Sequence, residues 1–414
     1  MRIRLQIALV ATAALGLAAC GSTGPSGGRL ATLDGQPPLV IAHRGASGYL
    51  PEQTLEAYAR AVELGADVIE MDLVSTRDGV LIARHDPNLA ISTDVAKHPR
   101  FATRKKTVKV DGETQTGWFS HDFTLAEIKT LGAIATDPER PQEYNGKFKV
   151  ATFQEIIDFA KAKSKETGRT VAIYPETKNP TYFRDLGLPM EDKVIAALTA
   201  AGWNSKTAPV FVQSFEPGSL KYMKAKGLNT KLVQLIDGDA IDLKTGAMTY
   251  AVPVDRPYEW TKAGDRRNFD VMVTPAGLAE IKTYADGIGP WKRYIVSIKG
   301  SVGADGKPLD VNNDGKINDA DATLGLADHA RGRRAQGGAL RAPLHLPQRV
   351  AAARGRLRQG RPQGIRHLLP ARRRRRVHRF PRHRARRARG LPPSLRALRV
   401  CPAGTVFAEA SRKA

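Results

Sequence analysis

Three acidic side chains stand in or beside segments with the apolar character of buried strands. Glu70 and Asp72 are two residues apart in a predicted strand at 67–73, so their side chains point to the same face. Glu176 follows a second predicted strand at 170–174. Hard cations such as Ca²⁺ or Mg²⁺ prefer carboxylate oxygens, so the trio indicates a divalent metal site. The alternative for Glu70 and Asp72 is a pair of acidic side chains in salt bridges with basic ones. The alternative for Glu176 is a carboxylate at the N-terminus of a helix.

Two histidines and two basic side chains also follow predicted strands. His43 and His85 each come at the end of such a segment, and a histidine pair beside a metal suits general acid/base catalysis. Arg44 and Lys178 suit an anionic substrate, phosphate above all. Each of these residues alone is typical of a surface or cap position. Their coincidence at strand ends indicates an active site.

Strands and helices must alternate to bring these side chains together. The apolar patterns predict strands at 39–45, 67–73, 80–83, 170–174, 209–213, 231–235 and 271–274, and helices at 54–64, 152–163, 190–201, 219–226 and 278–284. Such alternation predicts a parallel sheet closed as a TIM (β/α)8 barrel, in which functional residues lie at the carboxyl ends of strands. The polar, Lys- and Gly-containing stretch 96–150 is interpreted as an insertion or cap over the site.

The N-terminus has the features of an export signal. Two arginines precede a short apolar run that ends in Leu-Ala-Ala before Cys20, which resembles a bacterial lipobox. We therefore predict a lipoprotein signal peptide at 1–20, with Cys20 as the lipidated residue, and a flexible Gly- and Ser-rich tether at 21–38. The expected protein is exported and held at the membrane by its lipid anchor, as a periplasmic or cell-envelope lipoprotein. The alternative is ordinary secretion with an incidental cysteine.

A second metal-binding pattern lies late in the chain. Residues 310–321 have the spacing of an EF-hand loop, with a glycine at the sixth position and an aliphatic residue at the eighth. The expected oxygen ligands are Asp310, Asn312, Asp314, Asn318 and Asp321. An aspartate at the twelfth position resembles dockerin loops. We predict a structural Ca²⁺ there that takes no part in catalysis; the alternative is an ordinary Asn/Asp/Gly turn.

The net charge of +24 is concentrated at one end of the 414 residues. Residues 326–414 hold 25 of the 65 basic residues, 24 of them arginine, but only two of the 41 acidic ones. Residues 1–325 are therefore almost neutral, which excludes a uniformly basic nucleic-acid-binding protein, and no nucleic-acid partner is expected. Two cysteines are too few for a disulfide framework.

The motifs resemble those of the glycerophosphodiester phosphodiesterase family. The similarity begins with His-Arg-Gly-Ala-Ser-Gly-Tyr-Leu-Pro-Glu-Gln-Thr at 43–54 and continues through 65–73, Asp78-Gly79 and His85-Asp86. It extends to Tyr-Pro-Glu-Thr-Lys at 174–178 and Tyr-Ala-Asp-Gly-Ile-Gly-Pro at 284–290, and covers roughly 39–325.

The resemblance implies a TIM barrel that hydrolyses glycerophosphodiesters to an alcohol and glycerol 3-phosphate. It also implies a role for each motif residue. His43 and His85 would be the acid/base pair, Arg44 would lie at the phosphate, and Glu52 would support the site, while the metal ligands would be Glu70, Asp72 and Glu176. The alternatives are a phospholipase-D-like enzyme of the same fold acting on another phosphodiester, and a lipid-anchored binding protein without turnover.

The arginine-rich tail at 326–414 is interpreted as out of frame. Members of the family that this chain resembles typically close the barrel with two stretches. These are similar to His-Pro-Tyr-Thr-Phe-Arg-Asn-Glu and Gly-Val-Asp-Gly-Val-Phe-Thr-Asp-Phe-Pro-Asp-Thr. GC-rich codons for these stretches, read one base early, encode residues 342–349 and 372–383 of this chain. We therefore predict a frameshift between about 321 and 333, so that the chain lacks the last barrel strands. The alternative is a disordered cationic tail that binds nucleic acid or anionic lipid.

Overall fold

The structure, a computed structural model, describes residues 37–242, 245–313, 315, 317, 321–324 and 405–406. The predicted signal peptide, Cys20 and nearly all of the tether lie outside these residues, as does most of the arginine-rich tail. The lipid anchor, the export and the frameshift therefore stay predictions. In the part of the chain that the structure describes, no helix has both the length and the apolar character needed to cross a bilayer.

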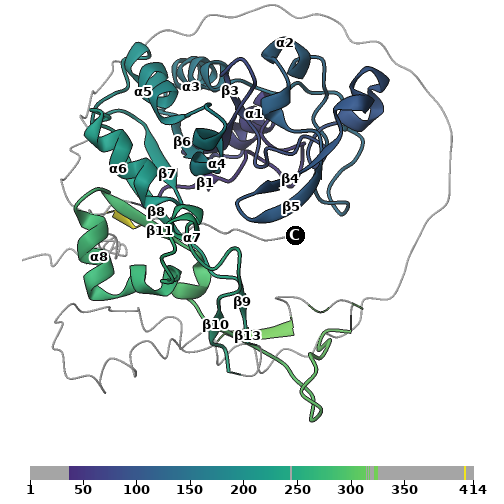
Figure 1. The fold of residues 1–414 in the computed structure, drawn as a ribbon, viewed down its shortest axis with the longest axis vertical. Coiled ribbons are helices and arrows are strands. Elements are labelled where there is room, and N and C mark those ends of the chain that lie inside the picture. The colour runs from purple at the N-terminus through teal and green to yellow at the C-terminus, as the bar shows by residue number, and fades with distance from the viewer. Residues whose placement is uncertain are drawn as a thin grey trace, which may run out of the picture. The chain divides into compact units, whose positions relative to one another are not determined.

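The central sheet is parallel and curls into part of a barrel (Figure 1). Its strands follow the order β1 (Ile41–Ala42), β2 (Val68–Ser75), β6 (Ala172–Thr177), β7 (Phe211–Ser214), β8 (Lys231–Ile236), β11 (Gly287–Pro290) and β14 (Thr405–Val406). A short β3 (Leu81–Ala83) pairs antiparallel with β2. Among the described strands, β1 and β14 form two unjoined edges. The fold is thus an incomplete TIM-type barrel, which confirms the predicted fold class.

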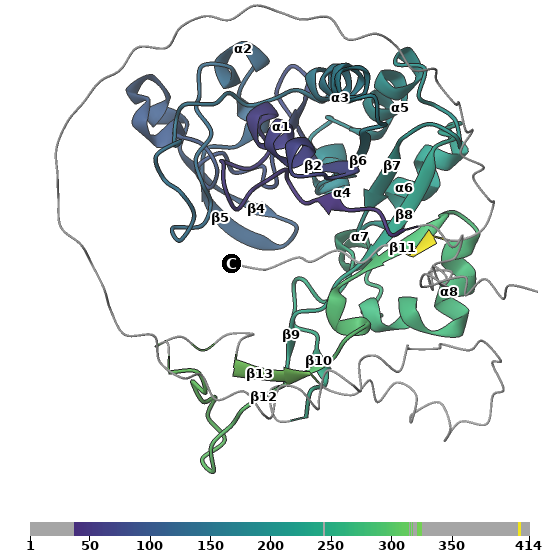
Figure 2. The same ribbon diagram turned by 180° about the vertical axis from the view of Figure 1, so that it is seen from behind.

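Helices between the strands pack against the outer face of this sheet (Figure 2). They are α1 (Leu55–Glu63), α3 (Phe153–Thr167), α5 (Glu191–Ala200), α6 (Pro217–Ala225) and α8 (Pro275–Lys282). Two shorter helices, α4 (Pro180–Asp185) and α7 (Tyr258–Lys262), follow β6 and β10 (Met248–Thr249) along the chain. The start of α3 is a complete capping box: Thr152 Oγ1 accepts the Glu155 N–H, and Glu155 Oε2 accepts the Thr152 N–H. The predicted start of this helix is confirmed.

The alternation of side chains along β2 separates core from site. Ile69 and Met71 face the helices and belong to the main apolar cluster. Val68 belongs to a second, smaller cluster inside the barrel, and Glu70 and Asp72 share its face because the strand repeat is two. The interior is therefore apolar at the start of the strands and carboxylate-rich toward their ends.

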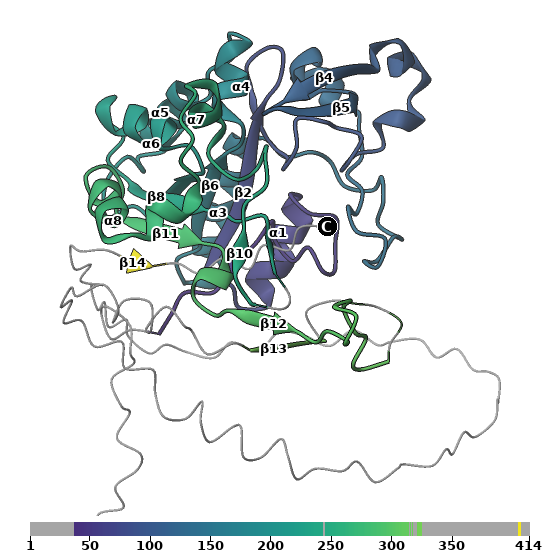
Figure 3. The same cartoon turned by 60° about the horizontal axis from the view of Figure 1, so that its bottom comes forward.

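The segment between β3 and α3 contains most of the additional structure. It holds α2 (Leu125–Ile128), the hairpin of β4 (Lys106–Val110) and β5 (Glu113–Gly117), and the 3₁₀ turns Val95–Lys97, Pro99–Arg104 and Ser120–Asp122. Two further hairpins follow β8: β9 (Ala240–Ile241) with β10 (Met248–Thr249), and β12 (Ile298–Gly300) with β13 (Ala322–Leu324) (Figure 3). Two further 3₁₀ turns lie at Phe269–Val273 and Lys292–Tyr294.

One strand prediction is wrong, and the barrel strand β11 was missed. Residues 271–274 lie at the end of a 3₁₀ turn, Phe269–Val273, because Thr274 caps α8 by accepting the Gly277 N–H. The next barrel strand is β11 instead. The sequence of β11 has no apolar alternation, because two of its four residues are glycines. Gly289 is required by close packing, since a Cβ there would lie 2.6 Å from Leu235 Cδ2.

The first strand is also shorter than predicted. Only Ile41 and Ala42 pair with β2, while Leu39 and Val40 are 47% and 58% exposed. The apolar pattern at 39–45 predicts burial on both sides, but β1 has a neighbour on one side only among the described strands. The exposed apolar residues thus follow from the open edge of the barrel.

Candidate active site

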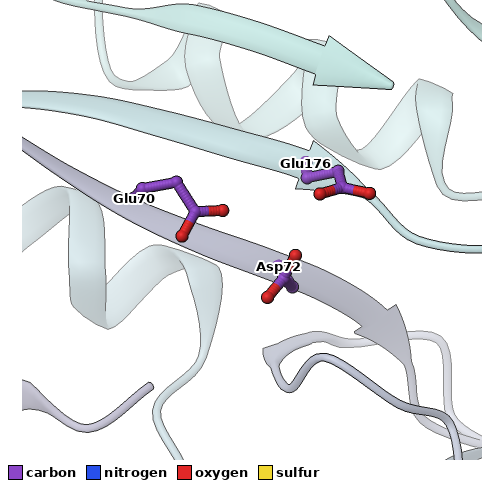
Figure 4. Close-up of side chains that lie close together, drawn as sticks. All are labelled: Glu70, Asp72 and Glu176. Atoms are coloured by element: carbon purple, nitrogen blue, oxygen red, sulfur yellow. The ribbon is translucent and has the colours of Figure 1, made fainter. Parts of the chain in front are cut away.

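The three predicted carboxylates converge on the inner face of two neighbouring strands (Figure 4). Asp72 on β2 and Glu176 on β6 are direct partners in the register of the sheet, and Glu70 lies one pleat repeat earlier on β2. All three are buried, and one oxygen from each lies within 4.8 Å of the others. This arrangement can hold a divalent cation, because its donors are hard and close together.

Glu70 is held in place from two directions. Its Oε2 accepts the backbone N–H of Arg44 at 2.7 Å, and its Oε1 accepts Nε2 of Gln213 at 3.1 Å. Arg44 has a left-handed backbone conformation, with φ at 58°, and in this conformation its N–H points to Glu70. The carboxylate therefore has a fixed orientation toward its neighbours.

Asp72 is surrounded by donors and cations. Its Oδ2 accepts Gln53 Nε2 at 2.5 Å and lies 3.2 Å from Arg44 Nε, and its Oδ1 lies 3.7 Å from Lys178 Nζ. Burial alone would raise the pKa of Asp72, but Lys178 and Arg44 outweigh burial and hold that pKa well below its usual range. Oδ1 is buried and makes no hydrogen bond, so it retains capacity for a further ligand.

The two cations lie against the carboxylates and are themselves anchored. Lys178 Nζ lies 2.9 Å from Glu176 Oε1. Arg44 Nη1 lies 3.2 Å from Oε1 of the buried Glu52, whose Oε2 lies 3.3 Å from Arg140 Nη1. Glu52 therefore links the first strand end to the 96–150 segment and restrains the Arg44 guanidinium.

The two histidines both lie near Asp72 and line different cavities. His43 follows β1, and burial and the neighbouring Arg44 lower its pKa to about 3. His85 Nδ1 lies 3.0 Å from Asp86 Oδ2, and this contact lowers the pKa of Asp86 against the opposing effect of burial. His43 is therefore neutral over the physiological range, whereas the His85 ring is held by the Asp86 carboxylate.

The strand before His85 is not the parallel barrel strand that we expected. β3 runs antiparallel to β2, with Leu73 opposite Ala83, and the Arg84 N–H donates to the Asp72 carbonyl oxygen at 3.0 Å. The chain thus reaches the end of β2, turns and comes back. This return, rather than a parallel strand end, brings His85 to the level of Asp72.

Two glutamines support the carboxylates and were missed in the sequence. Gln53 and Gln213 are fully buried and donate to Asp72 and Glu70 respectively. Gln53 has φ at 63° and accepts a hydrogen bond from Tyr58 Oη at 2.7 Å. The available signals were a polar residue inside an otherwise apolar strand for Gln213, and the family-like motif itself for Gln53.

The predicted calcium loop lies apart from these residues, between β12 and β13. Asp310 Oδ2 accepts the Gly315 N–H and Asp321 Oδ1 accepts the Val311 N–H, both at 2.8 Å. The first and twelfth loop positions therefore both face the loop backbone. Asn312 belongs to the described part of the loop, whereas Asp314 and Asn318 lie outside the described residues.

Comparison with known proteins places this site in a family. The model of the "Glycerophosphoryl diester phosphodiesterase family" matches residues 43–299. This range includes all three carboxylates and both histidines. The chain belongs to this family. Family membership indicates that it is an enzyme that hydrolyses glycerophosphodiesters, as the motifs predicted.

Similar phosphodiesterases occur in plants and bacteria. The chain is 42% identical over 273 residues to glycerophosphodiester phosphodiesterase GDPD6 of Arabidopsis thaliana, covering 63% of this chain and 67% of the relative. It is 35% identical over 275 residues to the glycerophosphodiester phosphodiesterase of Haemophilus influenzae, covering 63% and 70%. A solved Oleispira antarctica phosphodiesterase in complex with sn-glycerol-3-phosphate is 19% identical, with a TM-score of 0.39 and coverage of 72% and 90%.

Proposed function

We propose that the chain hydrolyses glycerophosphodiesters to an alcohol and glycerol 3-phosphate with a divalent metal and two acid/base histidines. The supporting observation is the buried carboxylate trio with both His43 and His85 close enough to Asp72 to interact with its charge. A panel of glycerophosphodiesters, each assayed with and without a chelator, tests the proposal. Hydrolysis that resists exhaustive chelation would refute the metal requirement.

Glu70, Asp72 and Glu176 are the residues that would hold the cation, Ca²⁺ or Mg²⁺. Their fit rests on three clustered buried carboxylates and on the Oδ1 of Asp72, which lacks a hydrogen bond. When bound, the cation would neutralise charge on the phosphoryl oxygens. Gln53 and Gln213 would keep two of the carboxylates oriented, as outer partners of metal ligands commonly do.

Arg44 and Lys178 would bind the phosphodiester. Both are partly buried beside the carboxylates and both are held by ion pairs, so they lose little freedom on binding. Two fixed cations can stabilise the charge that accumulates on the phosphoryl oxygens in the transition state. Glu52 would act through Arg44, as a positioning residue.

The two histidines would divide the proton transfers. His43, neutral beside Arg44, would accept the proton of the attacking hydroxyl, which belongs either to the 2-position of the glycerol or to water. The new P–O bond forms as the bond to the alcohol breaks. Attack by water gives glycerol 3-phosphate directly, whereas attack by the glycerol hydroxyl would give a cyclic phosphate that a water molecule then opens to glycerol 3-phosphate. His85, oriented by Asp86, would give a proton to the departing alkoxide, which leaves as the alcohol.

Asp72→Asn is expected to weaken metal binding by more than about tenfold, because it removes a charged ligand and leaves Arg44 and Lys178 less compensated. Calorimetric titration of chelator-treated protein with Mg²⁺ or Ca²⁺ measures the effect. Glu63→Gln, which changes an exposed carboxylate on α1, is the matched control. Unaltered affinity in the Asp72 variant would exclude this cluster as the metal site.

We also propose that the 310–321 loop binds a structural Ca²⁺. Asp310→Ala is expected to remove one equivalent of bound calcium, because the first loop position supplies a ligand, and to lower the thermal midpoint in calcium. Asp305→Ala, in an exposed turn shortly before the loop, is the control. The same calcium stoichiometry in both variants would argue for an ordinary turn.

A further inference from the structure

A pocket of about 220 Å³ opens beside His85. Glu176 and Lys178 line its inner end, and His43 does not line it. Since the proposed function makes His85 the donor to the leaving alkoxide, this pocket lies where the alcohol part of the substrate must be. Its volume is below the roughly 300 Å³ of pockets for drug-sized ligands, so it suits a small head group rather than an acyl chain.

The rim of the pocket includes a carboxylate without a matching cation. Asp111 occupies the turn of the β4–β5 hairpin, and its Oδ2 accepts the neutral Asn179 amide at 2.6 Å. Its Oδ1 is buried without a hydrogen bond. No ion pair in the described part of the chain includes Asp111. Burial raises its pKa to about 6, because the hydrogen bond from Asn179 and the more distant Lys178 offset burial only in part.

The other charges on the pocket wall leave it acidic. Glu113 and Asp237 also line it. The two basic residues of the wall are already engaged, since Lys178 pairs with Glu176 and Arg256 pairs with Asp255. A cation entering the pocket would therefore meet the carboxylate of Asp111, which forms no ion pair among the described residues.

Aromatic side chains complete the wall. Phe215 and Phe269 lie edge to face, with ring centroids 6.0 Å apart, and Tyr258 lines the same pocket. The hairpin turn reaches this wall, because a Cβ on Gly112 would lie 3.9 Å from Tyr258 Cε2. Aromatic rings beside a carboxylate form a favourable environment for an alkylammonium group, because the ring faces attract cations.

We infer that this pocket selects glycerophosphodiesters whose alcohol carries a positive charge, such as choline or ethanolamine, and that Asp111 is the specificity-determining residue. The inference rests on the proposed function, and it adds a substrate class and a residue that lies outside the carboxylate trio. A neutral polyol such as glycerol would fill the same space but leave Asp111 without a cation.

Asp111→Asn tests this selectivity with little risk to the fold. Asp111 and Gly112 both have positive φ, and Asn-Gly suits such a hairpin turn as well as Asp-Gly does. We expect the ratio of kcat/KM for glycerophosphocholine to kcat/KM for glycerophosphoglycerol to fall about tenfold, as for loss of one partly buried charge pair. Glycerophosphoethanolamine should behave like glycerophosphocholine. Glu143→Gln, an exposed acid of the same 96–150 segment, should leave the ratio unchanged.

The possible failures are distinguishable. Asp111→Asn could lower kcat/KM equally for the charged and neutral diesters, or leave their ratio unchanged. Either result would overturn the inference about Asp111 but leave the proposed function intact. The assay uses the full chain and its frame-corrected form. If neither hydrolyses any of the three diesters, the proposed function fails, and the inference fails with it.

Discussion

His85→Ala is expected to lower kcat for glycerophosphocholine by about 10²–10⁴, the usual contribution of a positioned acid/base group. The reason is that a choline alkoxide leaves poorly unless it is protonated, and in the proposed mechanism His85, beside Asp86, is the proton donor. His85 also lines the pocket of about 220 Å³ proposed above for the alcohol, the alcohol pocket. Metal binding should remain, because His85 is not one of the three carboxylates. Steady-state kinetics and calorimetric metal titration on the same preparation measure both effects.

The matched control is His98→Ala. His98 Nε2 lies 3.1 Å from Asp94 Oδ1, a histidine–aspartate contact like that of His85 but outside the carboxylate trio and the alcohol pocket. Its loss should leave kcat within about twofold. If His85→Ala retained full turnover, its assigned role would be wrong. Loss of metal binding in that variant would show a structural defect instead.

A change of leaving group separates the two histidines. A nitrophenyl ester of glycerol 3-phosphate releases a weakly basic phenolate, which leaves without a proton donor. His85→Ala should therefore lose far less on this ester than on glycerophosphocholine, whereas His43→Ala should lose similarly on both. The opposite pattern would exchange the roles of the two residues.

Restoring the alternative reading frame from about residue 321 is expected to raise phosphodiesterase activity from near background to that of a working enzyme, and to raise the thermal midpoint. The physical reason lies at β1. Its outer edge has no partner among the described strands, and Leu39 and Val40 are 47% and 58% exposed. Closing strands would pair with this edge and cover those side chains. Activity and thermal unfolding of both forms measure the change.

A chain ended after residue 325 is the control for frame restoration. It removes the arginine-rich tail without adding closing strands, so any gain that comes only from losing the tail would appear in it as well. Comparable activity in the original and frame-corrected chains would refute the frameshift. An independent read of the gene with an unbroken frame would refute it too.

The carboxylate trio was readable from the sequence because each member belongs to a local pattern. Glu70 and Asp72 share a face through the two-residue repeat of a strand, and Glu176 follows a recognisable apolar run. Their convergence needed only the rule that parallel strands end at one edge of a barrel. The return of the chain at β3 was not readable, because a short apolar run does not reveal the direction of the strand.

The β4–β5 hairpin shows where local signals were present but incomplete. Asp111-Gly112 between Val- and Thr-containing arms is a hairpin signal, and it could have been read. Its contact with Asn179, which follows β6, could not, because it depends on how the whole 96–150 segment packs over the barrel.

By itself, the sequence determined the family, the barrel class and the side chains that carry the chemistry, because residue type and short-range periodicity are local properties. The tertiary structure alone decided that Asp72 and Glu176 are register partners, that Gln53 and Gln213 orient the carboxylates, and that Asp111 faces the alcohol pocket. These contacts join residues up to 143 positions apart. They follow from the packing of the sheet and its connections as a whole, which no short stretch of sequence contains.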